Sequence, residues 1–82
     1  MEVIVRDGKQ MAAALRRFRR ASRMTQAQVA ASAGVRQATI SEVETVSPEA
    51  NTGTLYRILA ALDLEIVIRP RTKGVEHFED IF

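Results

Sequence analysis

The stretch TQAQVAASAGVRQATISEVE at residues 25–44 constrains the fold more strongly than any other part of this sequence. Thr25 is typical of a helix N-cap, and Gln28, three residues later, completes a capping-box pattern. Gly34 predicts the end of this first helix at residue 33, because glycine adopts a left-handed backbone without steric cost. A short helix that begins and ends so sharply is typical of a motif in which a second helix follows at once.

The residues around Gly34 have the sizes that a close helix crossing requires. A second short helix is expected over residues 37–44. Ala30 is small enough to let the two helices approach each other at the crossing. The apolar contacts that lock the pair are expected from Val29, Val35, Ile40 and Val43. The joint spacing of these residues predicts a helix-turn-helix.

Further helices are expected on both sides of this motif. Asp7 and Gln10 form a second capping-box pattern, which predicts a helix over residues 8–22. The buried side of that helix is expected to contain Met11, Leu15, Phe18 and Ser22. Asn51 is expected to cap a fourth helix over residues 52–62, with Tyr56 partly buried on it. The predicted fold class is therefore mainly α, with four helices.

The composition excludes several classes of protein. The chain has 82 residues, no cysteine and a single histidine, His77, which excludes a disulfide framework, a thiolate zinc site and a multi-histidine metal site. No histidine accompanies a serine in a plausible catalytic triad, and there is no glycine-rich phosphate loop, so we expect neither enzymatic activity nor a cofactor. The chain lacks a membrane-length apolar run and the order of a signal peptide, so a cytoplasmic location is expected.

The charge is spread unevenly along the chain. Residues 1–36 hold eight Lys or Arg against two acids, although the net charge of the whole chain is only +2. A basic half on a nearly neutral protein favours a polyanionic partner, and nucleic acid is the leading candidate. Within the first helix, the residues best placed to contact phosphates are Arg16, Arg20 and, just beyond it, Arg23.

The exposed face of the helix over residues 37–44 carries side chains that read bases. Gln pairs with adenine, Arg pairs with guanine, and Ala or the Thr methyl contacts the thymine methyl. The predicted base-reading residues are Arg36, Gln37, Ala38, Thr39 and Ser41. Gln26 is expected to contact phosphate and to brace Gln37, and Thr25 and Gln28 are expected near the DNA backbone.

These motifs resemble a known family. TQAQVAASAGVRQATISEVE is similar to the helix-turn-helix of Xre/Cro-type phage repressors. RQATISEVE, followed by NTGTLYRILAALDL and LEIVIR, resembles HipB-type antitoxins over about residues 9–69. The resemblance implies a dimeric four-helix repressor domain that represses its own operon, binds a palindromic operator and binds a HipA-type Ser/Thr kinase toxin. It also implies a structural ion pair between Arg19 and Glu44. The sequence departs from the family at Arg23, where glycine is frequent, and at Thr52 and Gly53.

The segment LEIVIR has strand character but needs a partner strand, because a lone strand is not stable. Two partners are possible: the same segment of a second subunit, or the chain's own EVIV at residues 2–5. We favour the first, which gives a homodimer with an intersubunit sheet. The predicted dimerisation residues are Leu64, Glu65, Ile66, Val67, Ile68 and Arg69. Whether EVIV joins that sheet is left open at this stage.

The domain is expected to span residues 1–69, and residues 70–82 are expected to be a flexible tail. Phe78, Ile81 and Phe82 in this tail suggest a segment that binds a partner protein, with a simple disordered end as the alternative. The leading functional hypothesis is a repressor that is also the antitoxin of a kinase toxin. The alternatives are a stand-alone phage-type repressor and a protein-interaction module with little DNA binding.

Overall fold

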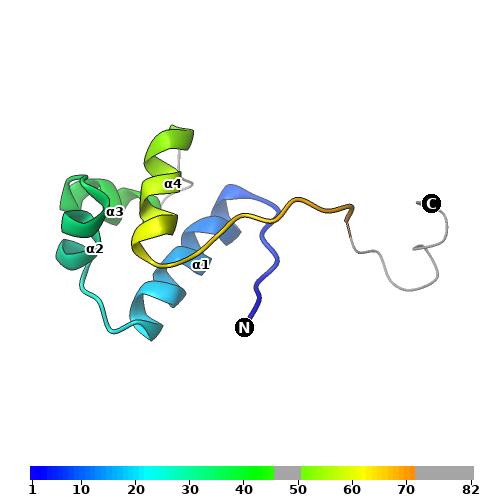
Figure 1. Cartoon of the computed structure of the whole chain (residues 1–82), viewed down its shortest axis with the longest axis horizontal. Coiled ribbons are helices and arrows are strands. Elements are labelled where there is room, and N and C mark those ends of the chain that lie inside the picture. Colours follow the sequence, from blue (N-terminus) through cyan, green and yellow to red (C-terminus); the bar gives the residue numbers. More distant parts are fainter. Residues whose placement is uncertain (46–50, 72–82) are drawn as a thin grey trace.

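A computed structural model describes residues 1–45 and 51–71 of the chain, and four helices form its body (Figure 1). They are α1 (Gly8–Ala21), α2 (Gln26–Ala33), α3 (Gln37–Thr45) and α4 (Thr52–Ala61). The four-helix, mainly α fold predicted from the sequence is therefore confirmed. The predicted partner-binding residues Phe78, Ile81 and Phe82 lie outside the described residues.

Three of the helices begin at side-chain caps that the sequence predicts. The Thr25 side chain accepts a hydrogen bond from the Gln28 backbone N–H (3.1 Å), and the Gln28 side chain accepts one from the Thr25 backbone N–H (2.8 Å). Asn51 Oδ1 likewise accepts from the backbone N–H of Thr54 at the start of α4 (2.8 Å). Each cap satisfies a backbone donor that the first turn of a helix leaves unpaired.

The cap of α1 differs in one detail from the capping box that the sequence predicts. Asp7 Oδ1 accepts from the Gln10 backbone N–H (2.8 Å), as expected. The Gln10 side chain, however, accepts from the backbone N–H of Arg6 (2.6 Å) instead of that of Asp7. The glutamine therefore ties the end of the N-terminal extended segment to the first turn of α1.

The core lies where the four helices meet. Its largest fully buried side chains are Leu15, Val29, Ile40 and Ile58, one from each helix. Helix α2 packs against α3 and α4, and α1 packs against α3. Ala30 is buried on α2, as the predicted close crossing requires. Dense packing of this kind tolerates little change in side-chain volume.

Two expectations about burial are wrong in part. On α1, Leu15 is buried, but Met11 and Phe18 are only half-buried and Ser22 is exposed. Ala12 and Ala14 are buried on that helix, although neither belongs to the apolar cluster where the four helices meet. Tyr56, expected to be partly buried on α4, has more than half of its surface exposed.

Two extended segments flank the helices. Residues 1–6 precede α1, and residues 63–71 leave the end of α4 and run along α1 (Figure 1). Neither forms a strand within the described ranges, and no backbone hydrogen bond joins residues 1–6 to residues 64–71 there. Pairing of LEIVIR with the chain's own EVIV is therefore absent from the single chain. In the described part of the chain, no helix is both long and apolar enough to cross a membrane.

Candidate nucleic-acid interface

The turn between α2 and α3 is set by Gly34. Its φ of +71° and ψ of +35° lie in the left-handed region. The Val35 backbone N–H donates to the Ala30 carbonyl across the turn (3.0 Å). A Cβ at position 34 would meet no atom within 4 Å, so the preference for glycine comes from the backbone conformation alone. This turn directs the N-terminal end of α3 away from the core.

The first turns of α3 present the predicted base-reading residues. Arg36, Gln37 and Ala38 are exposed, and Thr39 and Ser41 are half-buried. The opposite side of the helix is buried through Ile40 and Val43. No acidic residue lies in its first turn, so the partial positive charge of the helix N-terminus is not neutralised there. The structure therefore gathers these five residues on one surface that suits an anionic, hydrogen-bonding partner.

The exposed arginines of α1 supply a second set of positive charges. Arg16 and Arg20 lie four residues apart on one face of α1, and Arg23 follows beyond the helix. All three are exposed, and none forms an ion pair with another described residue. By contrast, Arg17 donates a hydrogen bond to Met1 Sδ (3.4 Å) and so lies beside the N-terminal segment. This contact with Met1 distinguishes Arg17 from Arg16, Arg20 and Arg23, the three arginines predicted to bind phosphates.

Arg23, where the family pattern has a frequent glycine, adopts a left-handed backbone conformation. Its φ of +57° is left-handed, a region that costs an L-residue roughly 1–2 kcal/mol. The sequence resemblance places a frequent glycine at this position. The structure therefore shows why glycine suits it, while arginine adds a charge beside the N-terminus of α2.

The predicted ion pair between Arg19 and Glu44 is present and joins α1 to α3. Arg19 Nε donates to Glu44 Oε2 (2.6 Å) and Nη2 donates to Oε1 (3.0 Å), while Nη1 donates to the Met24 carbonyl (2.9 Å). The two side chains are 12% and 3% exposed, so water screens the pair little. The hydrogen bond to Glu44 and its negative charge hold the pKa of Arg19 above its ordinary value, against the effect of burial.

Gln26 takes part in this network instead of bracing Gln37. Its Nε2 donates to Glu44 Oε1 (3.3 Å), and the predicted contact with Gln37 is absent among the described residues. The reason is the position of the two helix ends: Gln26 begins α2 beside the C-terminal end of α3, where the buried carboxylate of Glu44 accepts its hydrogen bond. Sequence reasoning missed this contact and the bond to the Met24 carbonyl, because spacing alone does not show which acceptor a glutamine or arginine reaches. The side chains of Thr25 and Gln28 are engaged in the cap of α2.

The described residues contain no group of three or more His, Cys, Asp or Glu that could hold a metal ion. A family model described as a helix-turn-helix domain matches residues 10–69, well over half of the chain. The chain belongs to the helix-turn-helix domain family. It thus has the fold of a DNA-binding transcriptional regulator.

One curated relative supports this assignment at the level of sequence. It is described as the uncharacterized HTH-type transcriptional regulator y4dL of Sinorhizobium fredii, and it is 40% identical to this chain over 57 residues. The match covers 70% of this chain but only 29% of the relative. The chain therefore spans less than a third of that regulator.

Solved structures of HipB are similar to this chain over most of its length. A HipB–O2 20mer complex matches with a TM-score of 0.80 at 28% identity, covering 85% of this chain and 97% of the other. A HipA–HipB–O2–O3 complex matches with a TM-score of 0.79 at 29% identity, covering 88% and 100%. A HipB–O4 20mer complex gives 0.79 at 28% identity, covering 84% and 97%. The HipB-type resemblance found in the sequence is confirmed at the level of the fold.

Proposed function

We propose that this protein is a dimeric, sequence-specific repressor that binds duplex operator DNA through α3. The observation that carries the proposal is the exposed, acid-free start of α3, with Arg36, Gln37 and Ala38 at its tip. An α-helix fits the major groove of B-DNA, and Arg and Gln at its N-terminal end reach base edges there. The similarity to HipB complexes with 20mers supports the same role for this chain. We also propose that this protein is not an enzyme.

The proposed contacts divide into two kinds. Arg36, Gln37, Ala38, Thr39 and Ser41 would read bases. The backbone of the DNA would be bound by Arg16, Arg20 and Arg23, with Thr25, Gln26 and Gln28 near the same phosphates. Base contacts set the sequence preference, whereas phosphate contacts set the orientation and the salt dependence of binding. The two kinds can therefore be tested separately.

Gln37→Ala tests base reading. In a gel-shift titration with the DNA upstream of the protein's own gene, the substitution is expected to weaken binding by roughly 1–3 kcal/mol and to relax the preference at one base pair. The control is a duplex of scrambled sequence, for which Gln37→Ala should leave the weaker affinity unchanged. Equal affinity of wild type and variant for the specific duplex, with unchanged preference, refutes the role of Gln37.

Arg16→Gln tests phosphate contact, with Arg17→Gln as the matched control on the same helix. The substitution removes one phosphate contact from each subunit of the dimer, so it is expected to reduce the slope of log K against log salt by about 1.8. Arg17 contacts Met1 and lies outside the proposed interface, so its variant should keep the wild-type slope. Equal slopes for the two variants contradict the assignment of Arg16.

Ile68→Asp tests dimerisation through the predicted strand. Ile68 is 94% exposed in the single chain, so the substitution should leave the four helices folded. In a dimer it would place a charge in the intersubunit sheet. Light scattering should then report a monomer, and operator affinity should fall because two half-sites are no longer bound together. Tyr56→Asp, at another exposed apolar residue, is the control. A dimer that survives Ile68→Asp contradicts the predicted interface.

We further propose that this repressor is the antitoxin of a HipA-type kinase toxin. The support is the similarity over 88% of the chain to HipB in a HipA–HipB–O2–O3 complex. Co-expression with the kinase-fold protein encoded beside this gene, when one is present, tests the proposal: a stable complex and restored cell growth are expected. Deletion of residues 71–82 tests the role of Phe78, Ile81 and Phe82, and it should weaken that complex without changing operator affinity. Growth arrest that co-expression does not relieve contradicts the antitoxin role and leaves a stand-alone repressor.

A further inference from the structure

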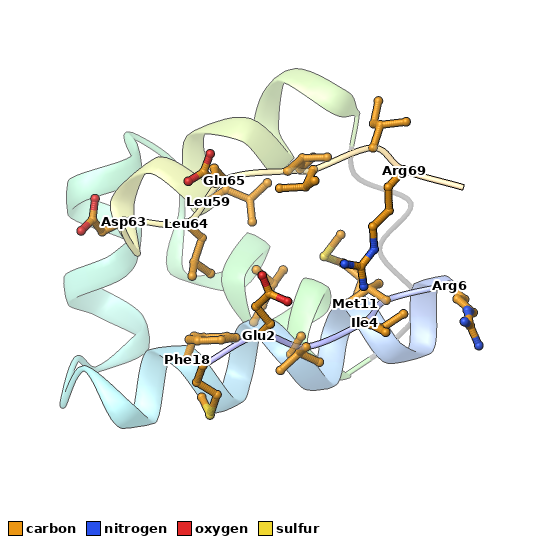
Figure 2. A pocket seen from close by; sticks show the side chains of 18 of the residues that line it. Glu2, Ile4, Arg6, Met11, Phe18, Leu59, Asp63, Leu64, Glu65 and Arg69 are labelled. Carbon is orange, nitrogen blue, oxygen red and sulfur yellow. The ribbon is translucent and has the colours of Figure 1, made fainter. Parts of the chain in front are cut away.

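A groove with an apolar floor lies between the two extended segments of the chain. Residues 1–6 form one wall and residues 63–71 form the other (Figure 2). Met11, Leu15 and Phe18 of α1 lie in its floor, and its volume is about 700 Å³. The two walls run in the same direction: Figure 2 shows Glu2, Ile4 and Arg6 in the same left-to-right order as Asp63, Glu65 and Arg69. The groove therefore has two parallel, extended edges.

The two walls carry the same sequence pattern. Residues 2–6 read EVIVR and residues 65–69 read EIVIR, each with three β-branched residues between a glutamate and an arginine. β-Branched residues favour strands, and the backbones of both segments lack any hydrogen bond to each other in the described part of the chain. Both segments therefore have the composition of strands, and neither is paired with the other.

Exposure follows a different course along each of the two segments. Val3 is 37% exposed and Ile4 is 51% exposed, while Val5 is half-buried. On the other wall, the exposed fraction rises from 45% at Ile66 through 71% at Val67 to 94% at Ile68. Alternate residues of a strand point to opposite faces of a sheet. A strand with Val3, Val5 and Ile66 on its inner face, toward α1, also has Ile68 on that face, and it has Ile4 and Val67 on the outer face.

We propose that residues 65–69 of a second copy of this chain occupy the groove. The result is a four-stranded antiparallel sheet in which each chain's residues 65–69 pair with the partner's residues 65–69 and with the partner's residues 2–6. The two N-terminal segments form the outer strands. This inference rests on the proposed dimer and adds the N-terminal segment to its interface.

Charge selects the antiparallel direction. When two copies of residues 65–69 pair around Val67, Glu65 of each lies opposite the other's Arg69. When residues 2–6 pair with the incoming strand, Glu2 lies opposite Arg69 and Arg6 lies opposite Glu65. Opposite charges across a strand pair stabilise it, and like charges destabilise it. Direct pairing of the two walls within one chain would be parallel and would align like charges in the register that matches the two apolar triplets.

The alternation of side chains along a strand supports the same register. The antiparallel alignment that pairs the charges also pairs Val3 with Ile68 and Val5 with Ile66, and strand alternation assigns all four to the inner face. It pairs Ile4 with Val67 on the outer face. A shift of one residue would oppose inner and outer residues, which a sheet with one buried face does not tolerate. The partner strand also covers Ile68, which is 94% exposed in the single chain.

Disulfide crosslinking tests this arrangement cleanly, because the chain has no cysteine of its own. Directly opposed residues on antiparallel strands lie within the Cα separation that a disulfide spans. In the full-length chain, Val3→Cys/Ile68→Cys should form a covalent dimer on mild oxidation, as should Val5→Cys/Ile66→Cys. The control is Ile4→Cys/Ile68→Cys, whose two residues lie on opposite faces and should not crosslink. Non-reducing electrophoresis of the oxidised proteins gives the readout.

The central pair of strands has a separate test. Val67→Cys alone should crosslink to the partner's Cys at the same position, because Val67 lies on the two-fold axis of the proposed dimer. A covalent dimer with Val67→Cys but with neither of the two double variants overturns the outer strand and leaves the proposed dimer intact. An intramolecular disulfide in the double variants, seen as a faster monomer, also overturns it. Absence of every crosslink, together with a monomer in light scattering, overturns the dimer itself.

Discussion

Removal of one partner from the Arg19–Glu44 pair is expected to destabilise the fold more than any surface substitution. The pair has two hydrogen bonds of 2.6 and 3.0 Å and little exposure, so each single variant leaves a buried charge without its partner. Such a loss costs about 3–5 kcal/mol. A chain of 82 residues has roughly 4–12 kcal/mol of stability in total. One substitution is therefore expected to remove a large fraction of the stability.

The two single variants should differ in a defined order. In Glu44→Leu, the Arg19 guanidinium keeps its hydrogen bond to the Met24 carbonyl. The Arg19 side chain is also the more exposed of the two, at 12% against 3% for Glu44. In Arg19→Met, the carboxylate of Glu44 keeps only the 3.3 Å bond from Gln26 and is 3% exposed. Arg19→Met should therefore be the more destabilising variant. The double variant should lie within about 1 kcal/mol of wild type, because an apolar pair of similar volume replaces the ion pair.

Urea unfolding followed by helical circular dichroism, at a fixed protein concentration, measures all four free energies of unfolding. Arg57→Met, at an exposed arginine of α4, is the control and should change stability by less than about 0.5 kcal/mol. Because the pKa of Arg19 is raised, its contribution is fully present below the unfolded-state pKa and would be lost only in strong alkali. Single variants that cost less than about 1 kcal/mol, or a double variant that equals their sum, refute the reasoning.

Three further predictions concern the helix crossing, the turn before α2 and the start of α4. Ala30→Leu should destabilise the fold by about 1–3 kcal/mol in urea unfolding, because the crossing of α2 leaves no space; wild-type stability would contradict the close approach. Arg23→Gly should raise stability by up to about 1 kcal/mol by relieving its left-handed backbone, yet lower the salt slope of DNA binding by the dimer by about 1.8, whereas Arg23→Lys should keep the slope. An unchanged slope in Arg23→Gly removes its phosphate contact. Asn51→Ala should cost about 0.5–2 kcal/mol in thermal unfolding, and no loss would mean that the cap is not needed.

The features that the sequence predicted well are those that depend on neighbours within one turn of helix. The caps at Thr25 and Asn51 and the left-handed Gly34 follow from local backbone chemistry, and the structure contains all three. The buried positions of Ile40 and Val43 follow from helical periodicity. Local rules of this kind need no knowledge of which helices pack together.

The features that the sequence predicted poorly depend on tertiary contacts. Ala12 and Ala14 of α1 are buried because other parts of the chain cover them. A search for the periodicity of large apolar residues does not detect buried alanines. Gln26 reaches Glu44 because the C-terminal end of α3 returns to the start of α2. The Arg19–Glu44 pair was predictable only through the family resemblance, since 25 residues separate its members along the chain.

The proposed DNA surface and the proposed dimer groove use different parts of the molecule. Figure 1 shows α2 and α3 on one side of the fold and the extended segment after α4 on the other. No residue of 36–41 lines the groove, which is bounded by residues 1–6 and 63–71. A second copy can therefore fill the groove while helix α3 of each subunit stays exposed. A dimer that binds a palindromic operator needs this separation, because the two half-sites lie about 34–36 Å apart. It follows that substitutions in the groove should change the affinity for a palindromic duplex far more than the affinity for a single half-site.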